Sequence, residues 1–162
     1  APFQGANNSF GFSRKLLKIN FIIGASLDSS ISDVNRCYLE KLITNKQARK
    51  HLVKELETVK KQAEKLGKRQ IKRQENFNKL LEKCEKIKGR AWCEVKLKPR
   101  LNKIIYRLNE INKKLIEVQL KAIIKQLEQF YKKQWISEKG YEIIKEDINW
   151  LINKLKEGGE II

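Results

Sequence analysis

Cysteine and histidine are scarce in this chain, which has three cysteines and one histidine among 162 residues. A zinc site needs three or four closely spaced ligands, and these four residues are scattered, with no C-x-x-C motif. The histidine, His51, stands in the basic stretch Arg-Lys-His-Leu-Val and is expected to be a solvated side chain. We therefore expect neither a metal nor a cofactor.

Long apolar runs are also missing. The longest uncharged apolar stretch, 21–27, is far shorter than the roughly 20 residues that span a bilayer. Arg14, Lys15 and Lys18 precede it, but this apolar core is too short and too far from the start for a secretory signal. The content of Leu, Ile, Val and Phe is nevertheless too high for a chain that is disordered throughout.

Catalytic patterns are absent as well. The sequence has no paired-carboxylate signature and no glycine-rich loop for holding phosphate. The sequence does not exclude a catalytic pair of a cysteine nucleophile and a histidine base, because such residues come together only in the folded protein. We expect that the protein is not an enzyme.

What is present is helical periodicity over most of the chain. Residues 1–12 show no hydrophobic periodicity and are predicted to form a flexible arm, which is followed by a short basic segment over 13–23. Ser30 and Asp33 suggest a capping box for a helix that ends near Ile43. The pair Thr44 and Asn45 caps a long helix that ends at Gly89, and Ser137 caps a last helix closed by Gly158 and Gly159. We find no strand pattern, so the predicted fold class is all-α, with helices paired antiparallel across the turns at Gly89 and 135–137.

Two apolar seams follow the alternating 3–4 spacing of a coiled coil. The first runs from Leu52 to Ile87 and is polar only at Gln70 and Arg73. The second begins after Pro99, which suits a first helical turn, and is formed by Leu101, Ile104, Leu108, Ile111, Leu115, Val118 and Ala122. Further along, this stripe widens with Ile105, Ile123, Ile124, Leu127, Phe130 and Tyr131. Cys84 and Cys93 flank Gly89 at similar distances. If the chain reverses there, they form either a disulfide or two small buried thiols.

Positive charge dominates the composition: 36 Lys and Arg against 19 Asp and Glu give a formal net charge of +17. Such a protein repels itself unless an anionic partner such as nucleic acid or a membrane surface is near. Residues 45–98 hold 18 basic and 7 acidic residues, whereas the final segment 137–162 holds 4 and 6. We divide the chain into an arm with a short basic helix (1–27), a basic helical DNA-wrapping region (28–98) and a C-terminal helical hairpin (99–162).

The charge peaks over 65–74, where the triplet Lys-Arg-Gln at 68–70 recurs at 72–74 with no acidic residue between. Like charges on adjacent turns weaken an isolated helix, which favours an anion that neutralises them. Since the seam also turns polar here, we expect the helix to leave its protein neighbour at this point; a solvated coiled-coil face is the alternative. The predicted phosphate-binding residues are Arg14, Lys15, Lys18, Arg49, Lys50, Lys61, Lys65, Lys68, Arg69, Lys72 and Arg73.

Four features together resemble an architecture found in archaeal viruses: the arm over 1–12, the helix with Arg14, Lys15 and Lys18, the basic run over 65–74 and the terminal helix over 137–155. The proteins with this architecture are the major capsid proteins of archaeal filamentous and rod-shaped DNA viruses. The resemblance implies a structural virion protein that coats double-stranded DNA in a helical nucleocapsid. It further implies self-association, a second related subunit and, in filamentous kinds, an overlying lipid envelope.

Two other classes of protein stay open. One is a cellular coiled-coil or chromatin-type adaptor, cytoplasmic or nucleoid-associated, whose seam binds a partner helix. The other is a peripheral membrane protein that uses residues 14–23 as an interfacial anchor. Aromatic residues are sparse in the basic run, which argues against base stacking on single strands as the main binding mode.

Overall fold

The computed structural model describes residues 26–162 and confirms an all-α fold. Its long helices are α1 (Leu27–Leu39), α2 (Lys46–Lys88), α4 (Lys98–Lys132) and α5 (Glu138–Lys156). A short helix α3 (Arg90–Trp92) and a π-helix η2 (Cys93–Leu97) join α2 to α4. The predicted arm and short basic helix, with Arg14, Lys15 and Lys18, lie outside the described residues.

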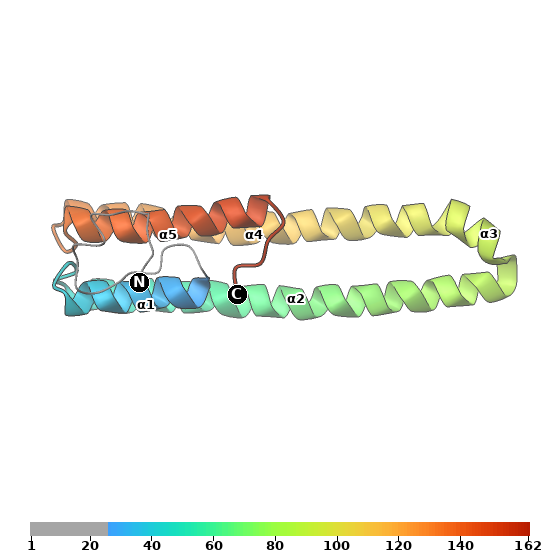
Figure 1. Ribbon diagram of the computed structural model, residues 1–162, viewed down its shortest axis with the longest axis horizontal. Coiled ribbons are helices and arrows are strands. Elements are labelled where there is room, and N and C mark those ends of the chain that lie inside the picture. The colour runs from blue at the N-terminus through green and yellow to red at the C-terminus, as the bar shows by residue number, and fades with distance from the viewer. Residues whose placement is uncertain (1–25) are drawn as a thin grey trace, which may run out of the picture.

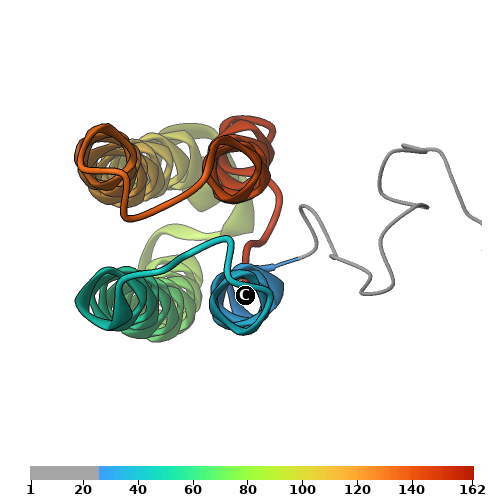
Figure 2. The same ribbon diagram turned by 90° about the vertical axis from the view of Figure 1, so that its left-hand side faces the viewer.

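Helices α2 and α4 form an antiparallel rod that is bundled at one end only (Figure 1). There α1 and α5 join the pair on one side, and the four helices stand at the corners of a square, each packed against two neighbours (Figure 2). At ~1.5 Å per residue α2 is about 65 Å long and α5 only about 28 Å. More than half of the rod is therefore a two-helix stalk that α1 and α5 do not cover.

The helix boundaries follow local sequence signals. Asn45 caps α2, since its Oδ1 accepts a hydrogen bond from the backbone N–H of Ala48 at 2.9 Å. Ser137 caps α5 in the same way, with its Oγ accepting from the N–H of Gly140 at 3.1 Å. Gly89 ends α2 with a φ of +88°, a left-handed conformation that glycine adopts without a steric penalty. These three predictions are confirmed.

Helix α1 begins earlier than the sequence predicts. Its N-cap is Ser26, whose Oγ accepts from the N–H of Ser29 at 3.2 Å while the Ser29 Oγ accepts from the N–H of Ser26 at 2.9 Å. The predicted cap, Ser30, is buried within the first turn, and Asp33 is buried further along the helix. Both Ser26–Ser29 and Ser30–Asp33 have the spacing of a reciprocal cap, so the prediction chose the wrong pair.

The closed end of the bundle is held by two matching turns. Lys41 and Gln134 adopt left-handed φ angles of 63° and 62° after α1 and α4, and Ile43 pairs with Ile136 in an isolated bridge. The N–H of Thr44 donates to the carbonyl oxygen of Trp135 at 2.9 Å, so the turns are joined through their backbones. This contact ties the α1–α2 hairpin to the α4–α5 hairpin.

A single apolar core fills the four-helix bundle. On α2 the predicted seam is buried at Leu52, Leu56, Val59 and Leu66, and again at Phe77 in the stalk. Beyond Phe77 the prediction is wrong, since Leu80 and Ile87 are exposed. It is also wrong that α2 leaves its neighbour at the polar positions, because α2 stays beside α4 through 65–74 (Figure 1). Polar residues of α4 meet this stretch, and Gln70 shares a groove with Asn109 and Asn112.

The core face of α4 includes Ile123, Leu127 and Phe130 from the widened part of the predicted stripe, but it does not include the regular 3–4 seam. Ile104, Ile111, Leu115 and Val118 are between 43% and 64% exposed, whereas Leu120 is fully buried. The reason is α5, which packs on the side of α4 that carries Tyr131, stacked on Tyr141 with ring centroids 4.7 Å apart. The buried face turns towards the space between α2 and α5, and is formed by Ile116, Leu120, Ile123, Leu127 and Phe130.

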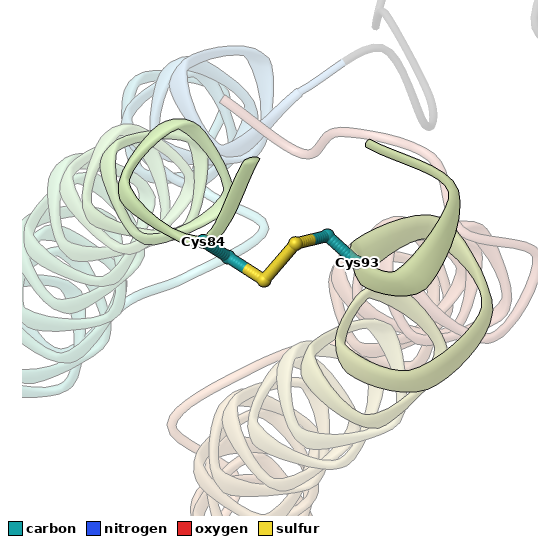
Figure 3. Close-up of a disulfide and its surroundings, with 2 residues drawn as sticks. All are labelled: Cys84 and Cys93. Carbon is teal, nitrogen blue, oxygen red and sulfur yellow. A yellow bond between two sulfur atoms is a disulfide. The ribbon is translucent and has the colours of Figure 1, made fainter. Parts of the chain in front are cut away.

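A disulfide joins Cys84 of α2 to Cys93 of η2 across the turn at Gly89 (Figure 3). The two Cα atoms are 6.1 Å apart, and Cys93 is buried. Of the two open alternatives for these cysteines, the structure has the disulfide. It closes the far end of the stalk, which lies outside the bundle core, whereas Cys37 of α1 is buried and takes no part in a disulfide.

The register of α4 predicts a sharp contrast between two leucines. Leu120→Ala removes a fully buried side chain and should lower the free energy of unfolding by about 2–5 kcal/mol. Leu115→Ala, on the exposed stripe, should lower it by less than about 1 kcal/mol. Urea denaturation followed by circular dichroism measures both. Equal losses, or a larger loss at Leu115, would contradict the observed register.

The disulfide predicts a thiol count. Alkylation of the denatured chain without reductant should label one cysteine, Cys37, and reduction should raise the count to three. Replacing Cys84 and Cys93 by serine removes a short cross-link, which should lower the free energy of unfolding by about 2–3 kcal/mol in the chain-entropy picture. Mass spectrometry and urea denaturation give the two readouts, and three labelled cysteines before reduction would contradict the pairing.

Candidate nucleic-acid interface

One face of α2 carries a continuous row of exposed lysines. At 100° per residue they fall within roughly 60° of the helix surface, on the side opposite Leu52, Leu56 and Val59. Because those three side chains are buried against the rest of the bundle, the lysines face outwards. We call this row the α2 ridge: Lys50, Lys54, Lys61, Lys65, Lys68, Lys72, Lys79, Lys83 and Lys86.

Nothing in the described part of the chain neutralises the α2 ridge by direct contact. Its lysines form no ion pair within 4.0 Å between residues 26 and 162. Four glutamates, at 57, 64, 75 and 82, border one side of the ridge at helical spacing, but none falls within 65–74. The middle of the ridge is thus its most positive part.

Five of the predicted phosphate-binding residues lie on the α2 ridge: Lys50, Lys61, Lys65, Lys68 and Lys72. Arg69 is exposed as well, but it lies between the ridge and the apolar seam by helical position. The structure therefore brings six of the predicted residues onto the outer surface of one helix. The charge run at 65–74 is the middle of a longer feature.

Arg49 has a different environment from the residues predicted with it. Its guanidinium donates to the Oδ1 of Asn35 at 3.4 Å and lies over the ring of Tyr38, 5.0 Å from the centroid. Both partners belong to α1, so Arg49 ties α1 to α2 rather than extending into solvent. Lys60 acts similarly: its hydrogen bond and ion pair with Asp28, at 2.9 Å, raise the pKa of its ammonium group.

Arg73 is half-buried where the stalk leaves the bundle. Its Nη1 atom is buried and has no hydrogen-bond partner among the described residues. By helical position it lies on the opposite flank of α2 from Arg49 and Lys60, which face α1. Arg73 therefore belongs to the uncovered side of the α2–α4 pair and not to the α2 ridge.

A second basic row on α4 was not predicted. It lies within roughly 40° of the helix surface, on the side away from α2, and all its members are exposed. We call it the α4 ridge: Lys103, Arg107, Lys114, Lys121, Lys125 and Lys132. Its basic residues follow one another in steps of four and seven, which places them on one face of the helix. Applied to α2, the same steps identify four further lysines of the α2 ridge that were not predicted: Lys54, Lys79, Lys83 and Lys86.

A groove opens where α1 and α5 end and the stalk begins. It has a volume of about 710 Å³ and lies between Ala63–Gln74 of α2 and Ile105–Ile116 of α4, with the C-terminal residues at its edge. Its lining mixes apolar side chains such as Ile71 and Tyr106 with the amides of Gln70 and Asn109. Within residues 26–162 there is no cluster of three or more His, Cys, Asp or Glu side chains suited to a metal ion.

No helix between residues 26 and 162 combines the length and the apolarity required to cross a membrane. Comparison with known proteins gives no further guide, since no protein family, no curated protein and no solved structure matches this chain. The two ridges are the main chemical features of the described surface.

Proposed function

We propose that this chain is a structural protein that coats double-stranded DNA by binding its phosphates without reading sequence. The observation that carries the proposal is the α2 ridge, nine outward lysines on one helix that form no ion pair with any residue between 26 and 162. From Lys50 to Lys86 it is about 54 Å long at ~1.5 Å per residue. That length matches roughly 16 base pairs at ~3.4 Å each, so many phosphates lie within reach of one helix.

The chemistry of the ridge suits backbone binding rather than base readout. Lysine is a flexible point charge that pairs with phosphate oxygens, whereas sequence reading relies on bidentate arginine, asparagine or glutamine side chains at base edges. Ridge positions are lysine throughout, and the nearby Arg69 lies at the ridge's edge. No catalytic step is part of the proposal.

The rod shape supports a coating role over binding at a single site. The α2 ridge and the α4 ridge lie on opposite outer edges of the antiparallel pair, so a duplex has access to either edge. A subunit placed between neighbouring turns of DNA in a packaged filament would neutralise phosphates on both sides. The setting we propose is the helical nucleocapsid of a filamentous virion.

The alternative is a cellular coiled-coil or chromatin-type adaptor that binds nucleic acid. It is favoured by the exposed apolar positions of the stalk, which suit a partner helix. Electron microscopy of the purified protein mixed with duplex DNA separates the two proposals. Long filaments with a regular repeat support packaging, whereas discrete particles scattered along DNA support the adaptor.

Binding should depend steeply on salt. If about six phosphates are neutralised per subunit, log K should fall with log[salt] at a slope near −5, roughly −0.9 per phosphate. Fluorescence anisotropy with two duplexes of unrelated sequence, across a salt series, measures this. A flat slope, or a preference above about tenfold for one duplex, would rule out sequence-independent coating.

The α2 ridge should matter beyond its contribution to net charge. Lys68→Gln with Lys72→Gln should reduce the magnitude of the salt slope by about 2, since two phosphate contacts are lost. The matched control, Lys139→Gln with Lys156→Gln, removes the same charge from exposed positions on α5 and should leave the slope nearly unchanged. Circular dichroism checks folding, which both variants should retain. Equal losses in the two variants would show that only total charge matters.

A further inference from the structure

The apolar residues of α4 that face solvent form a regular stripe. Ile104, Ile111, Leu115 and Val118 are 52%, 61%, 43% and 64% exposed, and Ala122 continues the row. Their steps of seven, four, three and four residues place them within roughly 60° of the helix surface. We call these five residues the α4 stripe. Such narrow 3–4 spacing is the signature of a helix that packs against another helix.

The α4 stripe lies on the uncovered face of the hairpin. By helical position it is opposite Tyr131, which contacts α5, and both α1 and α5 lie on the other side of the α2–α4 pair (Figure 2). No described helix packs on this face, since α1 and α5 both lie on the covered side of the α2–α4 pair (Figure 2). The regular seam has no occupant within residues 26–162.

Positive charge borders the α4 stripe on both sides. On α4 Arg107 and Lys114 lie beside the stripe, while Glu110 and Glu117 lie further round the helix and are paired with Lys113 and Lys121. On α2 the same face carries Arg69 and Arg73. The antiparallel register of α2 and α4 is fixed by the pairing of Ile43 with Ile136 and by the disulfide between Cys84 and Cys93. In this register the two arginines lie at the same height along the rod as the part of the stripe between Ile104 and Ile111.

We propose that the α4 stripe binds an amphipathic helix of a partner protein whose apolar seam is flanked by acidic side chains. Carboxylates on that helix would face Arg107 and Lys114 on one side and Arg69 and Arg73 on the other. They would also supply an acceptor for the buried Nη1 of Arg73, which has none among the described residues. A partner helix in this position adds a third helix to the two-helix stalk.

Charge argues against a second copy of this chain as the occupant. Two stripes of the same sequence would bring basic borders together in a protein with a net charge of +17, and like charges at such flanks disfavour pairing. The stripe also differs from a membrane-binding face, which is broader and commonly carries Trp or Phe. The proposal does not depend on DNA binding, since none of the five stripe residues belongs to a ridge, although Arg107 and Lys114 at its border are members of the α4 ridge.

The test uses the full chain and a fluorescein-labelled helical peptide of 25 residues. The peptide has Ile and Leu at 3–4 spacing and Glu at the flanking positions. The control peptide has the same composition with the apolar residues shuffled, so its charge is identical. Anisotropy should show binding of the regular peptide and at least about tenfold weaker binding of the shuffled one, because only the regular peptide buries a continuous seam.

Protein variants locate the site. Ile104→Gln, Ile111→Gln and Val118→Gln together should weaken peptide binding at least about tenfold, while folding and duplex affinity stay unchanged. The control, Ile71→Gln with Tyr106→Gln, removes exposed apolar groups from the groove on the covered face and should change binding less than about twofold. Arg69→Gln with Arg107→Gln should weaken binding and flatten its salt dependence.

Three results would overturn the proposal. The first is equal binding of the regular and shuffled peptides, or equal binding by the stripe variant and its control. The second is a dimer in sedimentation velocity that the stripe variant abolishes, which would make a second copy the occupant. The third is sedimentation with anionic phosphatidylserine vesicles that the stripe variant abolishes, which would make the stripe a membrane-binding face.

Discussion

The antiparallel packing of α2 against α4 is the constraint on which the rest of the structure depends. Each helix uses one face for this contact, and the buried positions fix what every other face presents to solvent. The lysines of the α2 ridge and the basic residues of the α4 ridge point away from the contact, so they lie on opposite edges of the rod. Both ends of the pairing are fixed, by the joined turns at Ile43 and Ile136 and by the disulfide between Cys84 and Cys93.

Electrostatic repulsion acts against this rod. Four glutamates border one side of the α2 ridge but none lies within 65–74, so the net charge of +17 leaves like-charge repulsion along the isolated rod. The bundle end offsets it with a compact apolar core, whereas the stalk has mainly Phe77, Cys93 and half-buried side chains at its contact. An anion bound along the ridge would stabilise the stalk, and this couples the proposed function to the stability of the molecule.

Features with a local cause could be predicted from the sequence. Helix existence, the caps at Asn45 and Ser137 and the reversal at Gly89 each depend on a few neighbouring residues. The core face of α4 could be predicted only in part, at Ile123, Leu127 and Phe130, because α4 has two apolar rows about 130° apart, and only the position of α5 decides which is buried. The more regular row, with Ile104 and Ile111, is the one left in solvent.

The candidate interface shows the same division. The charge density at 65–74 lies on α2, and its lysines share one outer face of that helix as their spacing predicts. The sequence could not show that Arg49 has a different role from these lysines, because its partners Asn35 and Tyr38 come from another helix. The outer parts of the α2 ridge and the whole α4 ridge were overlooked because their charges are spread over successive turns and not clustered.

Lysine footprinting with duplex DNA tests the central claim most directly. Acetylation of the native protein, with and without DNA, measures the reactivity of each lysine by mass spectrometry. The account predicts that DNA protects the α2 ridge, most strongly at Lys65, Lys68 and Lys72, and leaves Lys139 and Lys156 of α5 as reactive as before. Equal protection of all lysines, or protection confined to α5, would contradict the assignment of α2 as the DNA-binding surface.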